Sequence, residues 1–273
     1  MYDRILVPLD GSSFAEEIIP YARGFARSMG IGLMLLQVIA HERGLAAADE
    51  YEKRLAERLG AERKLVVTEA HPAIAILAEL NQRPRTLAAM TTHGRTGLLE
   101  AILGSVAHSV VRDAWRPVLV YRPRGTARDE AIREEARVNS LVAPLDGSGF
   151  SERMVPHAVE IARALEASLT LVQVLSPKTA EPPEARPGDV LESSYVRGQA
   201  MEIKTKYGIE ADWEVLHGDA ADAICDYVRG RHDVMLAMSS HTRAGLGESI
   251  LGSVTAECVQ RSGLPVLVYH PQE

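Results

Sequence analysis

The chain of 273 residues has few cysteines, few aromatic side chains and no long apolar run. Two cysteines cannot supply a framework of disulfide bonds or a four-cysteine zinc site. Aromatic residues make up 5% of the chain, so a core must be built mainly from valine, leucine, isoleucine and alanine. No run approaches the roughly 18–20 apolar residues that cross a bilayer, and Met1–Arg4 lead directly into a strand-like run. We therefore expect neither a membrane span nor a secretory signal.

The chain also has no excess of basic residues. Lysine and arginine number 30 against 37 aspartates and glutamates, which gives a formal net charge of -7. Surfaces that bind nucleic acid are basic, so the composition predicts no nucleic-acid partner. Hydrophobic residues at 46% and charged residues at 25% are typical of a globular protein. We expect a cytoplasmic protein of roughly two domains.

The chain contains two copies of one unit. The segment ILVPLDGS at Ile5–Ser12 returns as LVAPLDGS at Leu141–Ser148, and PVLVY at Pro117–Tyr121 returns at Pro265–Tyr269. The first offset is 136 residues and the second is 148, so the second copy carries 12 additional residues. We place them in the proline-rich stretch Ser176–Gly188, which is typical of a surface loop. A period of this length indicates duplication of a whole domain.

Within a copy, short apolar runs alternate with helical patterns. Several runs lack polar alternation, as do strands that are covered on both faces of a parallel sheet. Between them, apolar residues such as Ile18, Ala22 and Phe25 recur at helical spacing. Ser13 and Glu16 have the spacing of a capping box at the start of the first helix. The expected strands of the first copy are Ile5–Leu9, Gly32–Ile39, Lys64–Thr68, Thr86–Met90 and Val118–Tyr121.

This alternation predicts an α/β fold of two tandem doubly wound domains. We expect each domain to be an open five-stranded parallel sheet, in the order 3-2-1-4-5, with helices on both faces. The expected limits are 1–123 for the first domain, 124–138 for a charged linker and 139–273 for the second domain. The charged run Glu50–Arg63 is interpreted as the outer face of an amphipathic helix, and Cys225 and Cys258 as small core residues.

Right-handed crossovers place the loops after the strands along one carboxyl edge, where such sheets bind ligands. Residues 8–12 follow the first strand, residues 37–39 end the second, and residues 90–105 follow the fourth. In the last loop, Gly94 is followed by nine residues and then by Gly104 and Ser105, which open a helix. Glycines allow close approach of the backbone to a ligand, and a helix start offers free N–H groups to phosphate oxygens. Asp10 can accept hydrogen bonds from a ribose hydroxyl or a base amine.

With these segments the sequence resembles the universal stress protein family, in tandem two-domain form. The resemblance covers nearly the whole chain. Its strongest element is MTTHGRTGL at Met90–Leu98 running to GSV at Gly104–Val106, supported by VPLD at Val7–Asp10 and by the terminal PVLV of each copy. The ATP-binding branch of that family carries glycine, two residues, glycine, nine residues, then glycine and serine or threonine.

Carried over by position, the three glycines fall on Thr91, Gly94 and Gly104, so the first copy keeps two of them. In the second copy the positions are Ser239, Thr242 and Gly252, so one survives. The resemblance thus implies ATP or AMP in the first copy, with Mg²⁺ alongside ATP, and weak or absent binding in the second. It places the adenine and ribose near Pro8, Asp10, Val38 and Met90, and the phosphates near Gly94, Gly104, Ser105 and Val106. The full set of candidate residues adds Leu9, Thr91 and Arg95.

Each candidate has a structural alternative. Asp10 can be a turn residue that bonds the following backbone, Gly104 can serve helix–sheet packing, and Ser105 can act as an N-cap. His93 is interpreted as a hydrogen-bonding residue of its loop, and Arg95 is more often solvated than bound to phosphate. For the second copy the structural alternative is favoured. Its candidates are Asp146, Val174, Gly252, Ser253 and Val254.

Three classes of function remain open. The first is a nucleotide-responsive stress-response module without efficient catalysis, since no phosphate loop, nucleophile elbow or metal-ligand spacing is found and no catalytic residue can be named. The second is an interaction protein in which both sites are vestigial. The third is an adenine-nucleotide enzyme on the same fold. The terminal strands Val118–Tyr121 and Val266–Tyr269 are expected sheet edges, which would pair as an intramolecular pseudo-dimer or in a homodimer.

Overall fold

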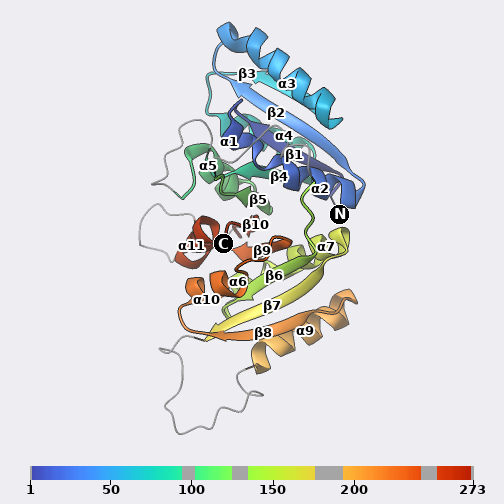
Figure 1. Cartoon of the computed structure of the whole chain (residues 1–273), viewed down its shortest axis with the longest axis vertical. Helices are drawn as coiled ribbons and strands as arrows, with labels where there is room; N and C mark the ends of the chain where they lie inside the picture. The colour runs from blue at the N-terminus through green and yellow to red at the C-terminus, as the bar shows by residue number, and fades with distance from the viewer. Residues whose placement is uncertain (1, 94–101, 125–134, 176–192, 241–250, 272–273) are drawn as a thin grey trace. The chain divides into compact units, whose positions relative to one another are not determined.

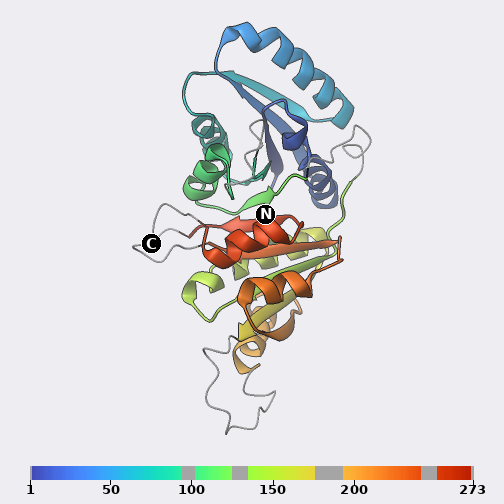
Figure 2. The ribbon, with the colours of Figure 1, turned by 60° about the vertical axis from the view of Figure 1, so that its left-hand side comes forward.

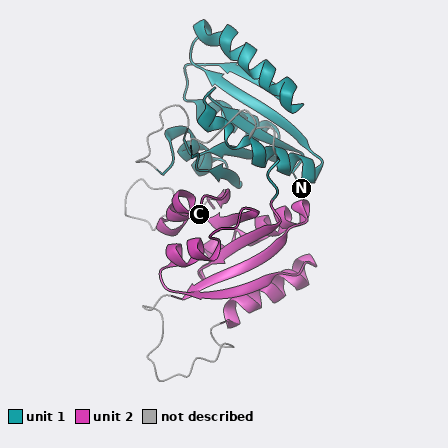
Figure 3. Cartoon of the chain, in the orientation of Figure 1, with its two compact units in different colours: residues 1–137, 272 teal, residues 138–271, 273 magenta. Residues whose placement is uncertain are grey.

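The structure is a computed structural model that describes residues 2–93, 102–124, 135–175, 193–240 and 251–271. The chain divides into two compact units, Met1–Arg137 and Val138–Pro271 (Figure 3). Most of the expected linker at 124–138 lies outside the described residues, so the domain limits 1–123 and 139–273 stay a prediction.

The first unit contains a parallel sheet in the order β3-β2-β1-β4-β5 (Figure 1), which confirms the expected order. Residues of β1 and β4 are buried almost throughout, which explains their unbroken apolar runs. The third strand begins two residues before the expected Lys64, because Glu62 already pairs with Met34. The strands are β1 (Arg4–Leu9), β2 (Gly32–Ile39), β3 (Glu62–Val67), β4 (Thr86–Thr91) and β5 (Val118–Tyr121).

Helices cover both faces of this sheet. Those that follow β1 and β2 lie on one face, and those that follow β3 and β4 lie on the other, where they pack on each other (Figure 2). None of the helices in the described part of the chain is long and apolar enough to span a membrane. The helices are α1 (Ser13–Glu16), α2 (Ile19–Met29), the 3-10 turn η1 (Glu42–Gly44), α3 (Leu45–Leu59), α4 (Pro72–Gln82) and α5 (Ser105–Asp113).

The second unit repeats this plan, with the strand order β8-β7-β6-β9-β10. Its strands are β6 (Ser140–Leu145), β7 (Ser168–Leu175), β8 (Asp212–His217), β9 (Val234–Ser239) and β10 (Val266–Tyr269). Its helices are α6 (Gly149–Glu152), α7 (Val155–Leu165), α9 (Ser194–Tyr207), α10 (Ala220–Tyr227) and α11 (Ser253–Arg261).

The predicted capping box at Ser13 and Glu16 is wrong by one residue. Ser12 is the N-cap, and its Oγ accepts a hydrogen bond of 3.2 Å from the N–H of Ala15. The reason is the preceding turn, where Gly11 at φ 78° reverses the chain in a conformation that favours glycine. The Glu16 carboxylate instead accepts a hydrogen bond of 2.7 Å from the Tyr51 hydroxyl.

The interpretation of Glu50–Arg63 as the outer face of one helix is wrong in two respects: α3 ends at Leu59, so that Glu62 and Arg63 belong to β3, and Glu52 is buried. The Glu52 side chain has no exposed surface, and its Oε2 lies 3.8 Å from Nη1 of Arg63, which belongs to β3 rather than to the helix. Burial raises the pKa of Glu52 to about 6, against the opposing charge of Arg63. Glu52 is therefore a buried carboxyl on the inner side of α3.

A second buried carboxyl lies across the sheet on α4. Glu79 accepts hydrogen bonds of 2.6 Å from Arg4 on β1 and of 2.6 Å from Lys64 on β3. Although burial by itself raises the pKa of Glu79, the bonds from Lys64 and Arg4 hold it below its ordinary value. This ion network joins α4 to the sheet, and Ser140 takes the place of Arg4 in the second unit.

Candidate functional site

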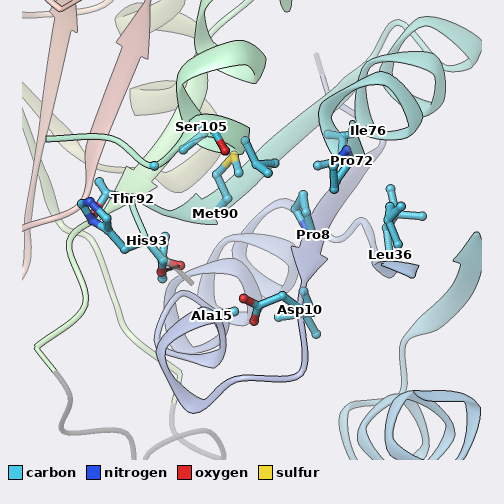
Figure 4. A pocket seen from close by; sticks show the side chains of 16 residues that line it. Pro8, Asp10, Ala15, Leu36, Pro72, Ile76, Met90, Thr92, His93 and Ser105 are labelled. Carbon is cyan, nitrogen blue, oxygen red and sulfur yellow. Dashed lines mark hydrogen bonds between the residues drawn. The ribbon is translucent and has the colours of Figure 1, made fainter. Parts of the chain in front are cut away.

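A pocket of about 270 Å³ opens at the carboxyl edge of the first unit (Figure 4). Its walls come from the ends of β1, β2 and β4 and from the starts of α1, α4 and α5. Figure 4 shows Pro8 between Met90 and Leu36, with Asp10 at the end of β1. Of the residues that the sequence predicted for the site, the structure brings together around this pocket Pro8, Leu9, Asp10, Val38, Met90, Thr91, Gly104, Ser105 and Val106.

Asp10 forms the turn after β1 and also lines the pocket. Its Oδ1 accepts hydrogen bonds of 2.9 Å from the Ser12 N–H and of 2.6 Å from the Ser12 hydroxyl. The interpretation as a turn residue is therefore confirmed. Because the turn holds the side chain in one orientation, it presents a carboxylate at the pocket wall.

The start of α5 is held at the same edge by backbone bonds. The Thr92 N–H donates to the carbonyl of Tyr121 at the end of β5 over 2.8 Å, and the Gly104 N–H donates to the carbonyl of Thr92 over 2.8 Å. A Cβ at Gly104 would lie 3.3 Å from that carbonyl oxygen, so a larger residue would push the two segments apart. The φ of Gly104 is -66°, a value that any residue can adopt. Glycine is therefore favoured here by the close approach to Thr92 and not by its backbone conformation.

The helix α5 has no capping side chain. Its N-cap is Gly104, so the expectation that Ser105 is the N-cap is wrong, and Ser105 is the first helical residue. The reason is that the close contact of Gly104 with Thr92 sets where the helix begins. The N–H groups of the first turn are the donors that a helix leaves without an internal partner, and they carry the positive end of the helix dipole. Ser105 and Val106 bring these groups to the pocket wall.

Two threonines and a histidine form the remaining polar wall. The Thr91 hydroxyl donates to the carbonyl of His93 over 2.9 Å, and the Thr92 Oγ1 lies 3.0 Å from His93 Nδ1. All three side chains are buried, with exposed fractions of 6%, 0% and 8%. These bonds agree with the interpretation of His93 as a hydrogen-bonding residue of its loop. Thr91 adds a Cβ and a methyl group where the family pattern has glycine.

The apolar wall includes residues that sequence reasoning missed. Leu36 lies two residues before Val38 and therefore on the same face of β2. The period of two in a strand could have identified it once Val38 was named. Pro72 and Ile76 come from the first turns of α4, which begins at this edge after β3, and which of its side chains reach the pocket depends on how the helix packs on the sheet. Thr92 and His93 lie inside the glycine segment and could have been found there. The other missed residues are Ala15 and Ala107.

Two predicted residues, Gly94 and Arg95, lie outside the described residues. The same holds for Thr242 in the second copy, where the family pattern has its second glycine. The candidate site is therefore described up to His93 on one side and from Ile102 onward on the other. The part that is described contains the apolar wall, the Asp10 turn and the start of α5.

The second unit keeps the turn but changes the helix start. Asp146 accepts from the Ser148 N–H over 2.9 Å and from its hydroxyl over 2.6 Å, as Asp10 does from Ser12. The Gly252 N–H donates to a side chain, the Ser240 Oγ, over 3.3 Å rather than to a backbone carbonyl. Gly252 is the N-cap of α11 and Ser253 is its first helical residue, so Ser253 is not an N-cap, just as Ser105 is not in the first unit. The remaining candidates lie at the end of β7 and in the first turn of α11, at Val174, Ser253 and Val254.

A threonine of α11 also occupies the space near β9. The Thr255 hydroxyl donates to the carbonyl of Ser239 over 3.0 Å, and the Thr255 side chain is 3% exposed. The corresponding residue in the first unit is Ala107, 148 positions earlier, which lines the pocket. The Thr255 side chain therefore fills space and hydrogen-bonds to a carbonyl at this edge of the second unit, whereas the smaller Ala107 lines the pocket of the first.

Comparisons with known proteins agree with this architecture. A model of the universal stress protein family matches residues 1–122 and 138–270. Universal stress protein Slr1230 of Synechocystis sp. is 22% identical over 303 aligned residues, which cover 97% of this chain and 99% of that protein. Universal stress protein MJ0531 of Methanocaldococcus jannaschii is 28% identical over 135 residues, which cover 47% of this chain and 79% of that protein.

A solved structure has the same fold over the whole chain. The crystal structure of a universal stress protein from Archaeoglobus fulgidus superposes with a TM-score of 0.70 at 18% identity and covers 98% of both chains. At this identity the likeness shows the fold alone. The family match, in contrast, spans nearly all of both units and coincides with the internal repeat of the sequence. The chain therefore belongs to the universal stress protein family and carries two family domains in tandem.

Proposed function

We propose that the first unit binds an adenine nucleotide, ATP or AMP, at the carboxyl-edge pocket and works as a nucleotide-responsive module of the stress response. The observation that supports this is one pocket with an apolar wall, a carboxylate and a helix start around it. A nucleotide needs these three chemistries at once, for the base, the ribose and the phosphates.

In this proposal the adenine packs against Pro8, Val38 and Met90, and the Asp10 carboxylate accepts a hydrogen bond from a ribose hydroxyl. The phosphates lie at the first turn of α5, where N–H groups and the Ser105 hydroxyl donate to anionic oxygens. The volume of about 270 Å³ is near the lower end of ligand pockets, at roughly 300–1,000 Å³. It suits a nucleoside whose phosphates extend outward, with Mg²⁺ held on those of ATP.

We propose binding without efficient turnover. The polar groups around the pocket hydrogen-bond within the fold, as Asp10 does to Ser12 and Thr91 does to the His93 carbonyl. In the described part of the pocket, the Thr92 hydroxyl lies 3.0 Å from His93 Nδ1, but both side chains are buried, at 0% and 8% exposed, so we expect this pair to support the loop and not to attack a phosphate. Hydrolysis of ATP would then be slow at most, and the bound nucleotide would act by stabilising one conformation of the edge. A ligand at about a hundredfold above its Kd stabilises the bound form by roughly 2.7 kcal/mol.

The proposal is tested by calorimetric titration of the full chain with ATP and with AMP, after mass spectrometry of any ligand released from the purified protein. The variant Gly104→Val is expected to abolish binding, because its side chain meets the Thr92 carbonyl and the phosphate end. The matched variant Gly252→Val is expected to leave the stoichiometry at one. If Gly252→Val alone abolishes binding, the assignment of the two units is reversed.

A milder pair of variants avoids damage to the fold. Asp10→Asn keeps an oxygen for the Ser12 bonds but removes the charge, and it is expected to weaken binding about tenfold, or roughly 1.4 kcal/mol. Asp146→Asn makes the same change in the second unit and is expected to have no effect. Absence of ligand together with absence of any thermal shift would favour an interaction protein with vestigial sites, and rapid turnover would favour an enzyme.

Pairing through the terminal strands of the two units is part of the proposal. Val118–Tyr121 and Val266–Tyr269 are β5 and β10, the last strand in the order of each unit. Chromatography with light scattering distinguishes a homodimer from a monomer with internal pairing. A strictly monomeric mass would remove the homodimer.

A further inference from the structure

A short segment beyond the last strand of the first unit lies against the helix α2. Residues 135–137, which we call the strap, have no regular secondary structure and come directly before Val138, the first residue of the second unit. The Ala136 N–H donates to the carbonyl of Pro20, in the first turn of α2, over 3.0 Å. The strap is therefore bound to the first unit through its backbone.

Gly24 leaves the room that the strap occupies. A Cβ at Gly24 would lie 1.9 Å from the carbonyl oxygen of Ala136, so any side chain there would force the strap away from α2. The helical conformation at this position does not require glycine, and glycine inside a helix is less favourable than alanine. The glycine is therefore explained by the close approach of the strap and not by the helix itself.

The strap is also held by charge. The two carboxylate oxygens of Glu135 lie 3.3 Å from Arg23 Nη2 and 2.7 Å from Arg27 Nη1. The side chains of Arg23 and Glu135 are 21% and 25% exposed, and that of Arg27 is 75% exposed. Ion pairs so close to solvent contribute little to stability and are screened by salt. The contacts that dock the strap are therefore specific in geometry but weak enough to open.

The second unit lacks the residues that receive the strap. The helix α7 follows α2 at an offset of 136 residues, so Val159 and Glu160 stand where the first unit has Arg23 and Gly24. A glutamate side chain at the position of Gly24 fills the place that the strap backbone takes in the first unit. The binding surface for the strap is therefore a feature of the first copy and not of the common fold.

The chain that leaves the last strand of the first unit is anchored at the same helices. The Arg124 N–H donates to the carboxylate of Glu17 over 2.7 Å. Glu17 is the C-cap of α1 and is 8% exposed. The described residues on both sides of segment 125–134 are thus bound where α1 meets α2.

We propose that residues 135–137 are a releasable strap, which docks on α2 and fixes the point at which the chain leaves the first unit for the second. Gly24 admits the backbone of the strap, and the Glu135 carboxylate holds it to the two arginines of α2. Release moves the point of departure from Arg137 back to Arg124, so the chain that joins the two units becomes longer.

Hydrogen exchange at the Ala136 amide of the full chain tests the strap, because the rate reports how often its bond to Pro20 is open. The amide is expected to be protected in the parent. Gly24→Ala is expected to raise the rate about tenfold or more, because the new methyl group overlaps the strap backbone, although alanine favours the helix. Glu160→Ala in α7 is the matched control and should leave the rate unchanged.

A second variant separates the charge from the backbone bond. Glu135→Gln keeps the Ala136 N–H but removes the ion pairs, and it is expected to raise the exchange rate about two- to fivefold. In the parent, a change from about 0.01 M to about 1 M salt should raise the rate by a similar factor, whereas Glu135→Gln should show no such rise. Small-angle X-ray scattering of Gly24→Ala should show a larger radius of gyration than that of the parent.

The strap is overturned if the Ala136 amide is unprotected in the parent, or if Gly24→Ala is as protected as the parent. A parent rate that does not depend on salt would overturn the role of Glu135. A fast amide together with an unchanged radius of gyration would overturn release as a lengthening of the tether. Circular dichroism checks that Gly24→Ala keeps its helices, and Glu135→Gln with the salt series decides the question if it does not.

Discussion

Replacement of the buried Glu52 by glutamine is expected to stabilise the first unit at neutral pH. The side chain of Glu52 has no exposed surface, and its nearest opposite charge, Arg63 Nη1, is 3.8 Å away. Its two carboxylate oxygens have no well-formed hydrogen bond within the described residues, although the backbone N–H groups of Lys64 and Gln37 oppose the rise in its pKa. Glutamine keeps the shape of the side chain and removes the charge, so the variant measures the cost of burying a carboxylate.

The magnitude follows from the pKa. Burial raises the pKa of Glu52 from an ordinary value of 4.5 to about 6. A folded-state pKa above the unfolded one favours folding at pH below 4.5, and this contribution is lost as the pH rises through 6. Each whole pKa step corresponds to 1.36 kcal/mol, so at pH 7.5 the ionised Glu52 destabilises the fold by about 2 kcal/mol. Glu52→Gln should gain up to that amount at pH 7.5 and close to nothing at pH 4.

Urea unfolding measured at both pH values provides the assay. The fluorescence of Trp115, in a Trp213→Phe background, reports the first unit alone, because these are the two tryptophans of the chain. Glu57→Gln on the exposed side of the same helix makes the same charge change and should shift the unfolding free energy by less than about 0.5 kcal/mol. A Glu52→Gln variant that is less stable than the parent at pH 7.5 would refute the reasoning, since attraction to Arg63 would then outweigh the desolvation.

Three further changes test other parts of the two units. Glu79→Gln should destabilise the first unit by about 3 kcal/mol in urea, because it leaves the buried Arg4 without its counter-charge. Since the pKa of Glu79 is held below its ordinary value, this loss of stability should diminish as the pH falls below about 4. A loss that is independent of pH would contradict the ion-pair account. Trp115 is 72% exposed and has a φ of 56°, a left-handed conformation that favours glycine, and its counterpart in the second unit is Gly263 with a φ of 69°. Trp115→Gly should therefore raise the stability by about 1 kcal/mol in calorimetry. A decrease would show that the indole packs on the fold. Ser12→Ala removes the N-cap of α1 and should cost about 1 kcal/mol by thermal melting, while Ser13→Ala, a neutral change by this structure, would be the costly one if the capping box were correct.

Several features of the fold could be predicted because they depend on local pattern. The strand Gly32–Ile39 was expected with the limits that the structure has, since its apolar run is bounded by turn residues on both sides. The cap of the first helix was placed one residue late, because Ser12 and Ser13 are both good caps and the choice depends on the turn at Gly11. The burial of Glu52 could not be predicted, because a charged residue within a charged helix has no local sign of facing inward.

The candidate site divides along the same line. Pro8, Asp10 and the residues after β4 were named from the sequence, because they follow strands whose carboxyl ends must share an edge in a parallel sheet. Pro72 and Ile76 were not named, because the side chains of α4 that reach the pocket depend on how the helix packs on the sheet.

By itself, the sequence determined that the chain is a duplicated α/β protein, and it marked the first copy as the one that keeps more of the glycine pattern. These conclusions follow from repeated residues and from periods of two and 3.6, which are properties of neighbouring positions along the chain. Only the tertiary structure decided that α4 completes the pocket wall and that Glu52 lies inside. The physical reason is that each of these contacts joins segments far apart in the sequence, and the packing of helices on the sheet sets which of their side chains meet.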